Sequence, residues 1–110
     1  MSSNRIYREG NAIEAMQAMY KRLRDKLEHT EKTHLKGEKT EIDLLVKYRD
    51  VSYILLEIML AQRIAGDLFA KLFDSLAEQA RELQIYFENE LLSLVKELRE
   101  ELEKREARNE

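Results

Sequence analysis

The chain has 110 residues, of which 44% are hydrophobic and 37% are charged, and its net charge is −3. This length allows one domain with a modest core and is too short for a two-domain enzyme. Cysteine and proline are absent and there are three glycines. These counts exclude disulfide frameworks, cysteine-based zinc sites and turn-rich β-sandwiches. The composition therefore predicts a single all-α domain over residues 1–110.

The first helix is predicted over residues 12–28, after a polar and flexible start at residues 1–10. Asn11, followed three residues later by Glu14, has the spacing in which both side chains satisfy free amides at a helix N-terminus. The apolar residues that follow are spaced three and four apart, which places them on one stripe of a helix. They are Ile13, Met16, Tyr20, Leu23 and Leu27.

A polar connection is predicted over residues 29–40. Its sequence, HTEKTHLKGEKT, holds one large apolar residue, Leu35, together with Gly37. Thr40 is a suitable helix N-cap, and the acidic Glu41 and Asp43 complement the positive end of the helix dipole. A second helix is therefore expected to begin at residue 41.

The second helix carries two apolar stripes, which make it hydrophobic nearly all round over residues 51–60. One partner helix of about twenty residues cannot cover it, so we expect self-association, at least to a homodimer. The predicted core places Met16, Tyr20 and Leu23 against Leu55, Ile58 and Phe69. The predicted oligomer interface comprises Val51, Leu55, Leu56, Ile58, Met59, Phe69 and Leu72.

Two courses of the chain beyond residue 60 remain open. In the favoured one, a single helix runs from residue 41 to about residue 105, with a kink near Gly66. In the other, a turn near Asp74 produces three helices, because Ser75 and Glu78 have capping-box spacing. Residues 106–110 are expected to fray. The predicted fold is thus an antiparallel helical hairpin, assembled as an oligomeric helical bundle or coiled coil.

No arrangement of residues predicts catalysis, a cofactor site or a metal site. Glu31 and His34 share a helix face, as in di-iron bundles, but a second such pair is missing and a solvated surface is the favoured interpretation. Glu57 lies alone in the apolar run and is expected at its rim, with Arg49 and Arg63 as candidate partners. We therefore expect a protein that is not an enzyme.

A non-enzymatic scaffold or adaptor that binds itself and another protein is the first functional hypothesis. The alternative is a small nucleic-acid-binding regulator, because Lys21, Arg22, Arg24 and Lys26 form a basic cluster that phosphates would attract. The first ten residues have no apolar core and no run approaches the roughly 20 apolar residues of a membrane span. A cytoplasmic protein without a membrane partner is therefore expected.

Overall fold

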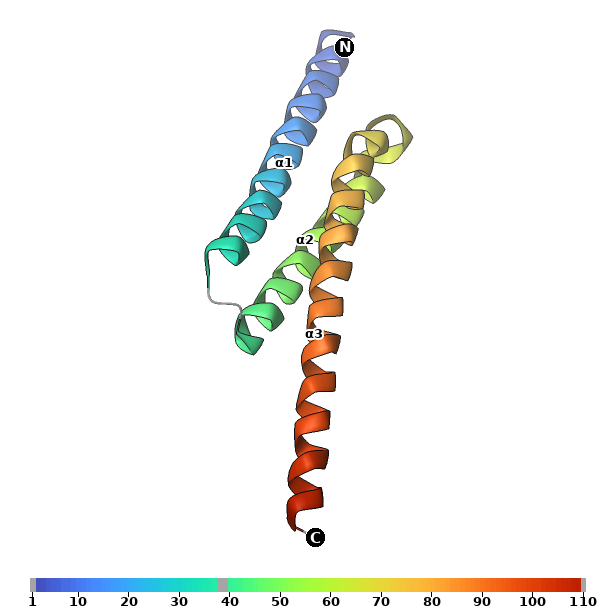
Figure 1. Cartoon of the computed structure of the whole chain (residues 1–110). Coiled ribbons are helices and arrows are strands. Elements are labelled where there is room, and N and C mark those ends of the chain that lie inside the picture. Colours follow the sequence, from blue (N-terminus) through green and yellow to red (C-terminus); the bar gives the residue numbers. More distant parts are fainter. Residues whose placement is uncertain (1, 38–39, 110) are drawn as a thin grey trace.

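The computed structural model describes residues 2–37 and 40–109, with side chains for 12–37, 40–67 and 69–109. These residues form three helices, α1 (Ser2–Lys36), α2 (Glu41–Ala70) and α3 (Asp74–Asn109), with a 3₁₀ turn, η1 (Lys71–Phe73), between the last two. The arrangement is long and thin, 82 × 26 × 16 Å (Figure 1). The predicted all-α class is confirmed.

Helix α1 is longer than predicted at both ends. It begins at Ser2, so residues 2–10 are helical where a flexible start was expected. Gly10 is the one poor helix former in this stretch, and a glycine inside a helix reduces its stability by only about 1 kcal/mol relative to alanine. At the other end, α1 continues through the predicted connection to Lys36. Only residues 37–40 link the two helices, and Glu38 and Lys39 lie outside the described residues.

The start of α2 is where the sequence predicts it. Thr40 has extended backbone angles, and its side-chain oxygen accepts a 3.1 Å hydrogen bond from the backbone N–H of Asp43. The connection is therefore closed by the N-cap that the sequence indicated.

Of the two predicted courses, the single helix from residue 41 to residue 105 is wrong and the three-helix alternative is confirmed, because the chain reverses between Gly66 and Asp74. Gly66 has φ 73° and ψ 178°, a conformation that is essentially confined to glycine. Across this turn, the Gln62 amide donates to the Asp74 carboxylate at 2.9 Å and to the Ala70 carbonyl at 3.3 Å. Helix α3 then returns antiparallel along α2, as Figure 1 shows.

The larger core cluster joins all three helices. Leu23, Ile58 and Phe73 are fully buried in it, and the Tyr20 ring meets Phe73 edge-on with centroids 5.9 Å apart. Of the predicted core residues, Leu23, Leu55 and Ile58 are buried, while Met16 and Tyr20 pack at the edge. Phe69 is half-buried, and Phe73 from the turn occupies the centre.

A smaller cluster, around Leu44, Val51 and Phe87, holds the other end of the α2–α3 hairpin. Leu91 and Leu94 pack against it. Beyond them α3 runs on past the start of α2, away from the N-terminal end of α1 (Figure 1). Residues 106–109 are helical, against the predicted frayed tail, and residues 95–109 are exposed.

No helix in the described part of the chain is both long enough and apolar enough to cross a membrane.

Candidate functional site

One side of α2 exposes a row of large apolar side chains, interrupted by Arg49. Its members recur about once per helical turn, on the side of the helix opposite Leu44, Val51 and Ile58, which are buried. Each is between 48% and 74% exposed. We call this the outer face of α2, and it consists of Ile42, Leu45, Tyr53, Leu56, Met59, Leu60 and Ile64.

The seven residues predicted to form an oligomer interface divide into two groups. Val51, Leu55 and Ile58 are buried within the chain, because α3 folds back onto one of the two apolar stripes of α2. Leu56 and Met59 belong to the outer face of α2, while Leu72 is exposed in η1 and Phe69 is half-buried. Participation of these four in an interface stays a prediction.

The predicted interface omits Ile42, which the apolar pattern missed altogether. It also omits four residues that the sequence places on the second apolar stripe of this helix, namely Leu45, Tyr53, Leu60 and Ile64. An eleven-residue spacing was the available signal, because it relates Ile42 to Tyr53 and Tyr53 to Ile64.

Glu57 lies at the rim of the apolar run, as the sequence predicts, with its side chain 40% exposed. Its carboxylate accepts from the Lys26 ammonium at 3.5 Å, across the α1–α2 contact. Neither arginine that was predicted as a partner of Glu57 takes that role. Arg49 pairs with its neighbour Asp50 at 3.2 Å, and Arg63 is exposed. The Glu57 carboxylate therefore contributes to helix packing at a solvated edge.

The basic cluster of α1 is exposed but partly neutralised. Lys26 is bound to Glu57, and the Arg24 guanidinium lies 3.9 Å from Asp25 and 6.0 Å from the centre of the Tyr20 ring. Lys21 and Arg22 line an open, shallow surface. Two of the four predicted cations thus have intramolecular acidic partners.

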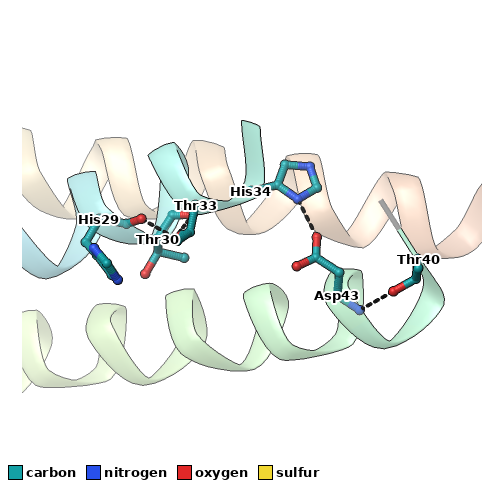
Figure 2. A network of polar contacts seen from close by, with 6 residues as sticks. All are labelled: His29, Thr30, Thr33, His34, Thr40 and Asp43. Atoms are coloured by element: carbon teal, nitrogen blue, oxygen red, sulfur yellow. Dashed lines mark hydrogen bonds and ion pairs between the residues drawn. The ribbon is translucent and has the colours of Figure 1, made fainter. Parts of the chain in front are cut away.

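Buried polar residues near the end of α1 form a network that the sequence did not predict (Figure 2). The Thr30 hydroxyl donates to the Lys26 carbonyl at 3.0 Å, and the Thr33 hydroxyl donates to the His29 carbonyl. His34 Nδ1 is 2.9 Å from Asp43 Oδ2. Because an ionised carboxylate only accepts, Nδ1 carries the proton in this pair.

The predicted solvated position of His34 is wrong, since its side chain is 3% exposed. Its ring meets Phe87 edge-on with centroids 4.8 Å apart, and Tyr86 lies beyond at 6.0 Å. His34 also lines a cavity of about 270 Å³, but Nε2 is inaccessible and has no hydrogen-bond partner among the described residues. Glu31, its predicted companion, is exposed. The imidazole thus anchors α1 to α2 and α3.

The comparisons with protein-family models, with curated proteins and with solved structures gave no match. Within residues 2–37 and 40–109, no three histidine, aspartate or glutamate side chains are grouped so that they would hold a metal ion. The outer face of α2, with its seven exposed apolar residues, is the candidate site.

Proposed function

We propose that this protein is a non-enzymatic helical interaction module, a scaffold or adaptor that self-associates through the outer face of α2. Aromatic side chains present roughly 150–250 Å² when fully exposed, and whole leucine, isoleucine and methionine residues are of the same order, about 200 Å². The exposed fractions of the seven residues therefore correspond to roughly 800 Å² of mostly apolar surface. The largest apolar patch on a typical monomer is about 300–600 Å². The outer face of α2 exceeds that range, which favours a surface that binds another protein chain.

The position of the patch supports docking of another helix. The row follows one helix for about six turns and lies opposite the side that contacts the core. Arg49 is the one charged residue along its centre line, between Leu45 and Tyr53. An apolar helix face of this length fits a second helix laid along it.

The test compares two charge-introducing double variants by sedimentation equilibrium. Leu56→Glu with Leu60→Glu places charge on the outer face, where no core residue is altered. Leu98→Glu with Leu102→Glu introduces the same charge at exposed apolar positions of α3. We expect the first variant to weaken self-association by at least about a hundredfold, and the second to leave it nearly unchanged. Equal effects of both variants would contradict the proposal.

The alternative function is nucleic-acid binding through the basic face of α1. Lys21 and Arg22, which form no ion pair with any acidic side chain that the structure describes, support it. The required result is binding to a duplex of arbitrary sequence whose affinity falls by roughly a hundredfold between 50 and 200 mM salt, as expected when four cations each contact a phosphate and release counterions. No binding at the lower salt would remove this alternative. In both cases we propose the cytoplasm as the compartment.

A further inference from the structure

We infer that the outer face of α2 takes the same face of a second copy, antiparallel, with a twofold axis at Tyr53. This rests on the proposed function and adds the identity and the orientation of the partner helix. The area already favours a second copy, because a standard interface buries about 800 Å² on each partner, close to the area that the outer face exposes.

The outer face is self-complementary about Tyr53. Ile42 and Ile64 lie eleven residues on either side of it and are both 74% exposed. In an antiparallel pair centred on Tyr53, each of these isoleucines therefore lies level with the other one of the second copy. Leu45 falls within one residue of Leu60 of the second copy. Apolar side chains thus meet apolar side chains at the centre and at both ends of the pair.

The spacing also keeps two such helices in contact. Ile42, Tyr53 and Ile64 repeat at eleven residues, as do Leu45 and Leu56. This repeat corresponds to about 3.67 residues per turn, so the seam runs nearly straight along the helix. A pair of α2 helices can therefore touch over the roughly 33 Å between Ile42 and Ile64.

Charge decides between the two orientations. Arg49 lies on the row, with its side chain 60% exposed. In a parallel pair, the two Arg49 guanidinium groups face each other within an apolar seam, which is unfavourable. In the antiparallel pair they are separated by about 12 Å along the axis, and the Glu57 carboxylate, which faces Lys26 of its own chain, is not needed to separate them. The antiparallel orientation is thus the one that this sequence favours.

Single cysteines test the orientation directly, because the chain has no cysteine of its own. Tyr53→Cys places two thiols at the twofold axis, and mild oxidation is expected to link two copies. Ile42→Cys alone is expected to form disulfides at least about tenfold more slowly than its equimolar mixture with Ile64→Cys. Only in the mixture does a cysteine of one copy lie beside a cysteine of the other. Ser93→Cys, which is exposed on α3, gives the background rate of random collision.

The mass of each variant, measured before oxidation, distinguishes a wrong orientation of the two copies from a failure of the chain to self-associate. A dimer in which Ile42→Cys links to itself as fast as the mixture does would overturn the antiparallel inference and leave self-association intact. A dimer in which no outer-face cysteine links faster than Ser93→Cys would move the interface to another surface. A monomer at every concentration would overturn both the inference and the proposed function.

Discussion

The imidazole of His34 and the carboxylate of Asp43 are joined by a 2.9 Å hydrogen bond across the connection between α1 and α2. His34 is buried against Phe87 of α3, while Asp43 lies in the first turn of α2. The hydrogen bond and the aromatic contact of this one side chain therefore tie the end of α1 to both helices of the hairpin. A polar side chain at this depth is favourable only while its partner is present.

Asp43→Ala is predicted to destabilise the fold, because it leaves the buried Nδ1–H of His34 without an acceptor. We expect the free energy of unfolding to fall by about 1–3 kcal/mol. Urea unfolding at one fixed protein concentration measures it. Asp25→Ala, which removes an exposed aspartate from α1, serves as the control and should change stability by less than about 0.5 kcal/mol. Equal losses from the two variants would mean that the His34–Asp43 contact contributes nothing.

Leu55 and Leu56 are neighbours with opposite surroundings, the first buried and the second 52% exposed. Leu55→Asp is predicted to unfold the chain, because an unpaired charge in the core costs more than about 3 kcal/mol. Leu56→Asp should keep the helical circular dichroism signal of the native chain and lose self-association. Far-ultraviolet circular dichroism and solution mass distinguish the two results. A folded Leu55→Asp variant would contradict the core described for α2.

Gly66→Ala is predicted to strain the turn between α2 and η1. No atom of the described residues lies within 4 Å of a Cβ built at this position, so the cost comes from the positive φ and not from a clash. We expect a loss of about 1–3 kcal/mol, measured by urea unfolding. Asp67→Ala alters the next residue, which has no positive φ, and should be nearly neutral. A Gly66→Ala variant as stable as the native chain would show that the turn takes another course.

Amide hydrogen exchange should distinguish the covered from the uncovered parts of α3. Residues 98–109 are all exposed, so we expect their amides to exchange through local unfolding of the helix and to show little protection. Amides around Phe87, at the buried end of the hairpin, should be protected by close to the global stability. Protection of residues 98–109 as strong as that of Phe87 would mean that this tail is covered in solution.

The length of α1 shows how far a hydrophobic pattern reaches. Leu23 and Leu27 were identified from their spacing, and the same 4-3-4 spacing continues through Thr30 and His34. Because Thr30 and His34 are polar, a search for apolar residues alone finds the end of the stripe at Leu27. Burial of Thr30 and His34 depends on the Lys26 carbonyl and on Asp43. Partners of this kind are known only once the helices are placed.

The turn at Gly66 shows a second limit. Neither a proline nor a polar loop interrupts the chain between Ile64 and Leu76, and the apolar spacing passes through Gly66 without a change of phase. The reversal depends on one glycine conformation and on the Gln62 amide bonded across to Asp74. The same reversal decides which apolar residues of α2 are covered, so Val51 and Ile58 became core and Leu60 remained exposed. The candidate surface followed from the fold and not from the pattern.

The central claim is that the outer face of α2 is closed by a second copy of the chain. Light scattering coupled to size exclusion, over a hundredfold range of concentration, tests it most directly. The native chain is predicted to have twice its mass of 13.1 kDa, and Leu60→Glu is predicted to reduce that mass to the single-chain value without loss of helix. A native chain that stays at the single-chain mass throughout, or a Leu60→Glu variant that remains a dimer, would contradict the account.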